Sequence, residues 1–270
     1  MHVHTFLFLL LAAAAAGAIT IDASQGLSHA SLGASLRKMR EDLATSPAII
    51  ADVERYAAAG YSLTADDLAR EALLCARVVS GLSNVRLAES KISGAGAGVF
   101  ATTDIAEGEI VTCYPGDVIM ALPPGDGQPR SSYGENRITI WGTHVPDELR
   151  EQATVDMEVY SLNVDENYAL VGLRALRDDM TYVGHMCNDG ARLNGLGGVD
   201  LRLTLPAYIE QTDARRNAGH ETVEGCHTVT VATRDISRGE EIYVTYGATY
   251  WKGALRRRNN AFGLALANFL

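Results

Sequence analysis

A short polar segment gives the first sign of chemistry in this chain. Residues 184–190 read GHMCNDG and bring a histidine, a cysteine, an asparagine and an aspartate into five positions. Such residues could ligate a metal, form a catalytic cluster or lie in an ordinary polar loop. The pair His185 and Cys187 has no further ligand at the usual spacing, which argues against a metal site. Cys187 is better explained as a packed side chain than as a nucleophile.

A glycine-rich segment at residues 93–100, SGAGAGVF, could let a ligand approach the backbone. Its glycines follow the spacing GxGxG instead of the GxGxxG of dinucleotide-binding loops. Residues 99–103, VFATT, favour a strand where a phosphate-binding loop would begin a helix. A dinucleotide loop is therefore excluded. Two interpretations stay open, a close backbone approach to another ligand and a plain β-turn.

Two similar turns frame the central part of the chain. Residues 101–111 read ATTDIAEGEIV and residues 232–247 read ATRDISRGEEIYVTYG, so each has Asp-Ile, a short gap and Gly-Glu before a hydrophobic strand. Together with the glycine-rich segment, their order and spacing from Arg86 to Trp251 resemble the SET-domain protein lysine methyltransferases. The resemblance implies a β-dominated α+β SET-domain fold, with short curved sheets around a threaded loop (pseudoknot).

The resemblance also implies roles for individual residues. Gly96-Ala97-Gly98, followed by Val99, matches the GxG element whose backbone approaches S-adenosylmethionine. Tyr114 opens a YxG element, and this tyrosine would line the lysine channel. The residues EEIYVTY match the ELxYDY ending and place Tyr246 where the family has its catalytic tyrosine. Trp251 stands where many members have an aromatic side chain against the cofactor.

The segment GHMCNDG matches the family motif NHSCxPN only in part. His185 and Cys187 match. The differences are Gly184 for the asparagine, Met186 for the serine and Asp189-Gly190 for the final Pro-Asn. The family's first asparagine contacts the methionine part of the cofactor, so one contact is missing here.

A nearby side chain could replace this contact. Asn188, Asp189 and Asn194 are the candidates because each lies close to Gly184 in the chain. We expect Gly184, His185 and Asn188 to belong to the cofactor site, the first two through their backbones.

The function that the resemblance implies is methyl transfer from S-adenosylmethionine to a lysine side chain of a protein substrate, a histone or another protein. No zinc is expected, because no cysteine follows Cys226 and the family's cysteine cluster after the catalytic tyrosine is therefore missing.

Two other classes of function compete with the enzyme. A catalytically inactive SET-like module would keep the fold and bind a peptide or protein partner. The altered segment 184–190 favours such a module, whereas Tyr114, Tyr246 and the GxG element oppose it. The third hypothesis, a secreted structural protein, is supported only by the N-terminal sequence.

The elements that position these residues can be predicted from periodicity. Apolar residues at three- and four-residue spacings predict helices from Leu36 to about Leu82, with Thr64 and Asp67 as a cap and Gly81 as the end. After Asn84 short β-rich runs take over. The predicted strands are 98–100, 109–112, 137–141, 157–162, 168–171, 201–205 and 228–232, with a hairpin turn at 165–167, loops at 123–132 and 217–224, and a final helix at 251–270.

These elements predict five regions along the chain. They are a targeting segment at 1–20, a flexible linker at 21–35, a helical region at 36–83, the SET-like domain at 84–251 and a helical tail at 252–270. The apolar run from Phe6 to Ala16 is too short for a stable membrane span. It favours secretory entry or a plastid-type two-part targeting sequence, with a nuclear or cytoplasmic location as the alternative.

The composition limits the classes of molecule that this protein is expected to bind. A formal net charge of −10 argues against nucleic-acid binding by bulk charge, and no direct sequence-specific nucleic-acid binding is expected. The four cysteines lie far apart, without a CxxC pair, so we expect mostly buried free thiols. The sequence carries no signal for an oligomeric state.

Overall fold

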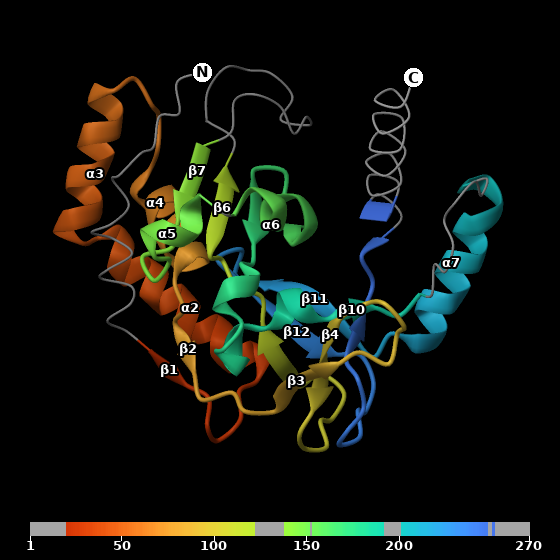
Figure 1. Cartoon of the computed structure of the whole chain (residues 1–270). Helices are drawn as coiled ribbons and strands as arrows, with labels where there is room; N and C mark the ends of the chain where they lie inside the picture. Colours follow the sequence, from red (N-terminus) through yellow and green to blue (C-terminus); the bar gives the residue numbers. More distant parts are fainter. Residues whose placement is uncertain (1–19, 122–137, 152, 192–200, 248–249, 252–270) are drawn as a thin grey trace, which may run out of the picture.

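The computed structural model describes residues 20–121, 138–151, 153–191, 201–247 and 250–251 (Figure 1). The helices are α2 (His29–Ala44), α3 (Pro47–Ala58), α4 (Ala65–Cys75), α5 (Asp147–Arg150), α6 (Thr154–Val159) and α7 (Leu201–Arg215). The strands are β1 (Ile21–Asp22), β2 (Val79–Ser80), β3 (Val85–Glu89), β4 (Ala97–Ala101), β5 (Ile110–Cys113), β6 (Val118–Ala121), β7 (Ile138–Trp141), β8 (Ser161–Asn163), β9 (Tyr168–Val171), β10 (Asn188–Asp189), β11 (Ala218–Val223), β12 (His227–Ala232) and β13 (Tyr243–Val244).

Short sheets make up the body of the protein. The largest has the strand order β7-β6-β9-β8 and is antiparallel throughout. A second sheet has the order β11-β12-β5, and three two-stranded sheets pair β3 with β4, β10 with β13 and β1 with β2. The predicted β-dominated α+β fold class, with a helical region before the sheets, is therefore confirmed.

Helices α2, α3 and α4 pack on one side of the sheets, as Figure 1 shows. Serine or threonine hydroxyls at Ser28, Ser46 and Thr64 cap their first turns. The predicted cap at Thr64 is confirmed, because its hydroxyl accepts the Asp67 N–H while the Asp67 carboxylate accepts the Thr64 N–H. These caps satisfy backbone donors that a helix start would leave without partners.

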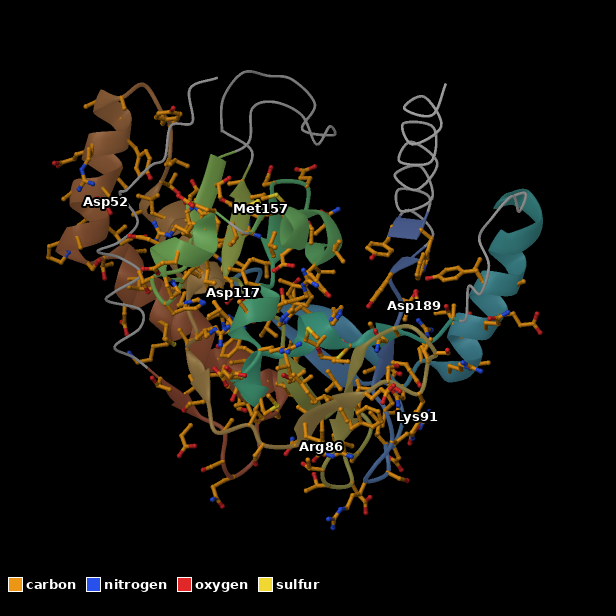
Figure 2. All side chains as sticks on the ribbon, in the orientation of Figure 1. Asp52, Arg86, Lys91, Asp117, Met157 and Asp189 are labelled. Carbon is orange, nitrogen blue, oxygen red and sulfur yellow. The ribbon has the colours of Figure 1, made fainter. Side chains whose placement is uncertain are left out.

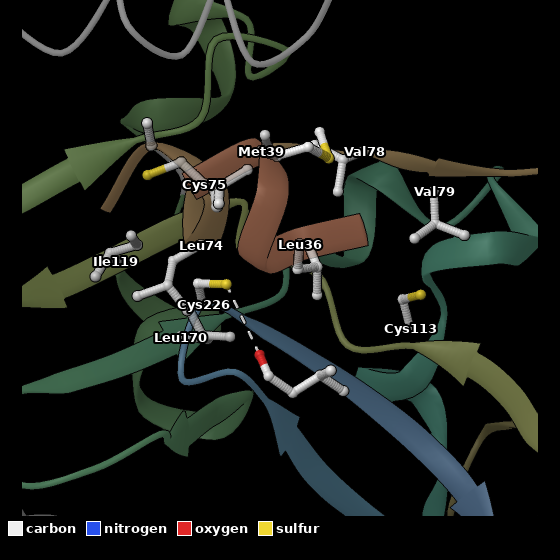
Figure 3. Packing of buried hydrophobic residues seen from close by; sticks show 14 of the residues in the cluster. Leu36, Met39, Leu74, Cys75, Val78, Val79, Cys113, Ile119, Leu170 and Cys226 are labelled. Carbon is white, nitrogen blue, oxygen red and sulfur yellow. Dashed lines mark hydrogen bonds between the residues drawn. The ribbon is translucent and has the colours of Figure 1, made fainter. Parts of the chain in front are cut away.

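One hydrophobic core joins these helices to the sheets. Leu36 and Leu74 lie in it with Ile119 of β6 and Leu170 of β9, and all four are almost fully buried (Figure 3). Cys226 belongs to the same core, where its thiol contacts the Val223 carbonyl oxygen at 3.8 Å. The helical region and the sheets therefore bury the same apolar surface.

Polar contacts cross this junction as well. The Tyr168 hydroxyl donates to the buried Glu71 carboxyl at 2.9 Å, which joins β9 to α4. The Arg70 guanidinium lies over the Tyr168 ring, donates to the Gly225 carbonyl oxygen at 2.6 Å and pairs with Asp165. Helix α4 is thereby fixed to two separate sheets.

The predicted flexible linker at 21–35 is wrong. Ile21 and Asp22 pair in parallel with Val79 and Ser80. Helix α2 begins at His29, inside the predicted linker, because Ser28 and Ser31 form a capping box there. Backbone pairing and a local cap therefore order a segment whose small polar composition predicted disorder.

Several predicted strands, turns and thiols are confirmed. Strands β4, β5, β7, β9 and β12 overlap the predicted runs. The turn at 165–167 joins β8 to β9, and the Asp165 carboxylate accepts the N–H groups of Asn167 and Tyr168. All four cysteines are buried and free.

Four other boundaries are wrong. Helix α4 ends at Cys75, and Val79–Ser80 forms β2 because it pairs with β1. Residues 157–162 divide between the end of α6 and β8. Residues 201–205 begin the fifteen-residue helix α7, so the longer helix overrides the local alternation. Residues 218–223 form β11 because they pair along their whole length with β12.

Some predictions lie outside the described residues. These are the targeting segment up to residue 19, the loop at 123–132, Asn194 with the glycines at 195–198, and the tail at 252–270.

Candidate functional site

Gly184 packs against two strands of the second sheet. A Cβ at this position would stand 2.8 Å from the Thr230 hydroxyl oxygen and 2.9 Å from the Cys113 carbonyl oxygen. Real Cβ atoms do not come this close, so any side chain would force β5 or β12 to move. The glycine that replaces the family's asparagine is therefore required by this packing.

Asn188 connects the segment 184–190 to the glycine-rich strand. Its side-chain nitrogen donates to the Ala97 carbonyl oxygen at 3.0 Å and to a Glu241 carboxylate oxygen at 3.2 Å. An amide nitrogen carries two hydrogens, so both are used inside the protein. Asn188 therefore lies beside the glycine-rich strand, as predicted, but its amide nitrogen has no hydrogen left for a ligand.

Glu241 is a buried carboxylate that sequence reasoning did not single out. It is fully buried and accepts hydrogen bonds from the Ser90 hydroxyl, the Lys91 N–H and the Tyr243 hydroxyl at 2.6–2.7 Å. With the Asn188 bond, it joins the turn after β3 to β10 and β13. Its sequence signals were its place in the Gly-Glu-Glu turn and at the start of the EEIYVTY match, and neither indicates burial.

The two glycines of the GxG element are required for different structural reasons. At Gly98 a Cβ would overlap the Glu241 carboxylate, so this glycine makes room for an internal group. Gly96 has a φ of +77° and open space where a Cβ would stand. Val99 is fully buried, and its carbonyl oxygen accepts the Ile242 N–H at 2.8 Å. Within this element, Gly96 is the residue whose backbone lies beside open space.

Tyr114 lies in an aromatic cluster. Its hydroxyl donates to the Tyr160 carbonyl oxygen at 2.6 Å, and its ring meets those of His220 and His185 edge-on at centroid distances of 5.1 and 6.3 Å. Burial raises the pKa of Tyr114 well above its ordinary value, with nearby Asp117 adding to the effect. The phenol is therefore neutral at physiological pH.

His185 is enclosed by aromatic and backbone groups. Its ring is buried, lies 5.7 Å from the Tyr160 ring, and fills the space where a side chain at residue 172 would stand. Neither ring nitrogen has a well-aligned hydrogen-bond partner within the described residues. Burial lowers the pKa of His185 to about 4, so the ring is neutral at pH 7. Gly172 is a residue the sequence analysis missed, and its only signal was a glycine directly after a predicted strand.

Tyr246 is held by its ring and its hydroxyl. The hydroxyl donates to the Cys187 carbonyl oxygen at 3.0 Å. The ring stacks on Trp251 with centroids 5.9 Å apart and an interplanar angle of 24°, and it contacts Tyr250 at 4.8 Å. Burial raises its pKa well above the ordinary value, and Tyr250, Cys187, Asp189 and Tyr114 add to the effect. Tyr246 and Tyr114 therefore both lie beside the segment 184–190.

The structure brings together all the predicted site residues that it describes. Gly184 touches β5 just before Tyr114, His185 contacts Tyr114, and Asn188 contacts the GxG strand. Asp189 accepts from the Tyr246 backbone and from the Trp251 indole. Residues from the GxG strand to Trp251 thus lie together around the segment 184–190.

The described residues hold no group of three or more histidine, cysteine, aspartate or glutamate side chains that could bind a metal ion. Within the same residues, none of the helices is both long and apolar enough to cross a membrane.

One comparison with known proteins identifies a family for this chain. The family model described as the SET domain matches residues 96–247, which is more than half of the 270 residues. Among solved structures, a candidate histone methyltransferase from Plasmodium falciparum is similar, with 17% identity, 62% of this chain and 96% of that chain covered, and a TM-score of 0.28. No curated protein matches the sequence. By the extent of the family match, this chain belongs to the SET-domain family.

Proposed function

We propose that the protein transfers a methyl group from S-adenosylmethionine to a lysine side chain of a protein substrate. The observation that carries this proposal is the pair Tyr114 and Tyr246, two neutral phenols that both lie beside the segment 184–190. Each hydroxyl donates to a backbone carbonyl oxygen, so its own oxygen lone pairs point to other partners.

These phenols suit a lysine amine as the reacting group. The amine must lose its proton before it can attack, and at pH 7 this costs an ordinary lysine about 4.6 kcal/mol. An aromatic channel lowers the lysine pKa because burial disfavours the ammonium form. Phenol oxygens can accept hydrogen bonds from the N–H groups of the neutral amine without adding a charge. Tyr246 and Tyr114 would thus align the lone pair for attack.

The residues around Gly96 fit the proposed cofactor. The open space beside Gly96 leaves its backbone accessible, and the rings of Tyr246 and Trp251 offer a flat apolar wall. S-adenosylmethionine supplies a methyl group on a positively charged sulfur. The backbones of Gly96, Gly184 and His185 would bind it in this proposal, together with Trp251.

The test replaces Tyr246 with phenylalanine. Tyr246→Phe keeps the ring that stacks on Trp251 and removes the hydroxyl, so the fold is retained while kcat falls by about 100-fold or more. Transfer of labelled methyl groups to mixed core histones and to a lysine-containing peptide library measures the effect. Tyr61→Phe, in the loop between α3 and α4, is the matched control and retains parental turnover. Near-parental turnover in Tyr246→Phe would contradict the proposed role.

A specific observation favours a second candidate, a SET-like module that binds a peptide or protein partner without catalysis. Gly184 cannot carry a side chain, and Asn188 uses both amide hydrogens internally, so the family's asparagine contact has no replacement at either position. Calorimetric titration of S-adenosylmethionine into the full chain separates the two. Saturable binding supports the enzyme, whereas no heat at millimolar cofactor in folded protein supports the module.

A further inference from the structure

Asp189 is a buried carboxylate at the junction of three segments. It lies between α7 and the C-terminal segment, defined as residues 243–247 and 250–251 (Figure 2), and only 4% of its surface is exposed. Five groups donate to its oxygens at 2.7–3.0 Å: the Tyr208 hydroxyl, the Thr212 hydroxyl, the Trp251 indole N–H and the backbone N–H groups of Ala191 and Tyr246.

All five donors are neutral. Within the described residues, no lysine, arginine or histidine forms an ion pair with Asp189. A carboxylate only accepts hydrogen bonds, so all five contacts are compatible with its ionised form. Buried charge is tolerated only when its hydrogen-bonding capacity is filled, which this set of donors does.

Two of these bonds determine the position of Tyr246. One Asp189 oxygen accepts the Tyr246 N–H at 3.0 Å, and the same oxygen accepts the Trp251 indole N–H at 2.9 Å. The Trp251 ring in turn stacks on the Tyr246 ring. Tyr246 is therefore held at its backbone directly and at its ring through Trp251.

Helix α7 is attached to the same carboxylate. Tyr208 and Thr212 are one helical turn apart, so both hydroxyls reach Asp189 from one face of α7. The Tyr208 hydroxyl also accepts the Gly247 N–H at 3.0 Å, next to Tyr246. Asp189 thus joins α7, the segment 184–190 and the C-terminal segment at one point.

We propose that Asp189 is a positioning residue for methyl transfer, which holds Tyr246 and Trp251 against the cofactor side of the site. This inference rests on the proposed function. Asp189 stands where the resembling motif has proline, which offers no side-chain acceptor. The Trp251 indole of this chain is attached through the Asp189 carboxylate.

Trp251 reports on this contact without any need for catalysis. The sequence has two tryptophans, so in a Trp141→Phe parent protein the emission comes from Trp251 alone. In that parent, Asp189→Asn keeps the side-chain size but places an N–H₂ group among five donors. We expect a red-shifted Trp251 emission and a lower anisotropy, because the indole loses its acceptor. We expect affinity for S-adenosylmethionine to fall by about 10- to 100-fold, which is typical for loss of a charged hydrogen bond.

Asp117 provides a matched control. It is also a fully buried aspartate, and it holds Arg77, His144 and the Leu173 N–H at 2.7–2.9 Å. Figure 2 shows it well away from Asp189. Asp117→Asn should lower thermal stability and leave the Trp251 emission at its parental value. A similar red shift in both variants would show a general loss of packing and would overturn the proposal.

The remaining outcomes separate the two proposals. Parental emission and parental cofactor affinity in folded Asp189→Asn would overturn the role of Asp189. No cofactor binding by the Trp141→Phe parent would instead contradict the proposed function, and the emission comparison would still decide whether Asp189 holds Trp251. If Asp189→Asn does not fold by circular dichroism, Tyr208→Phe replaces it. That variant removes one donor and should shift the emission in the same direction, whereas an unchanged emission would count against the proposal.

Discussion

Glu71 makes the junction between the helical region and the sheets sensitive to pH. Its carboxyl is 5% exposed and accepts the Tyr168 hydroxyl. Burial raises its pKa from 4.5 to about 7, although the Tyr168 bond and Arg70 act in the opposite direction. In the unfolded chain the group loses its proton near pH 4.5, whereas in the folded protein it does so near pH 7. Folding stability from this group is therefore complete at low pH and is lost as the pH rises from about 4.5 to 7.

The substitution Glu71→Gln removes this titration and keeps an oxygen that can accept from Tyr168. The shift of about 2.5 units corresponds to about 3 kcal/mol once the carboxyl is ionised in both states. At pH 5 the stability lost is only about 1 kcal/mol, because this pH is only slightly above the pKa of the carboxyl in the unfolded chain. Glu71→Gln should therefore gain about 2 kcal/mol relative to the parent protein between pH 5 and pH 8.

Urea unfolding followed by circular dichroism at pH 5, 6, 7 and 8 measures this gain. Other titrating groups are common to both proteins and cancel in the difference. The exposed Glu54, on α3, provides the control Glu54→Gln, whose stability difference should stay near zero at every pH. A pH-independent difference for Glu71→Gln would refute the reasoning, as would a variant that is less stable than the parent at pH 8.

Two further predictions concern buried residues. His227 is 1% exposed, and burial lowers its pKa from 6.5 to about 4, so the unfolded state takes up the proton first and stability falls as the pH drops through this window. The parent protein should lose about 2 kcal/mol of its free energy of unfolding at pH 5 because of this group. Urea unfolding at pH 7 and pH 5 should show a smaller loss in His227→Gln than in the parent, and an equal loss would contradict this prediction. Gly184→Asn should lower stability by about 1–3 kcal/mol, since the side chain displaces Thr230 or Cys113. Thermal unfolding and cofactor titration check this, and a variant with parental stability and tighter binding would show that the space exists.

Local pattern explains the elements that the sequence predicted correctly. Strands β4, β5 and β12 are runs of apolar and β-branched residues between turn residues, and their pairing agrees with that preference. The cap at Thr64 and the turn at Asp165 were predictable because each is made by residues within three positions. Such features depend on neighbours in the chain.

The errors share another origin. Residues 201–205 alternate like a strand, but they continue into a helix whose Tyr208 and Thr212 are bound by Asp189. Strand β11 is polar, and only its pairing with β12 makes it a strand. The partners of Asp189 lie as many as 62 positions away along the chain, so no local pattern could reveal its role. The residue types of the site were visible in the sequence, whereas the bonds that hold them were not.

The shared core of α2, α4 and the sheets has a consequence for how this domain could move between genes. The family match begins at residue 96, after all three packed helices. A gene fragment with that boundary would encode β6 and β9 without Leu36 and Leu74, and their apolar faces would meet water. Recombination at the edge of the family match would therefore yield an aggregation-prone product. A gene fragment that retains this core must begin at or before β1, so that it also encodes the three helices.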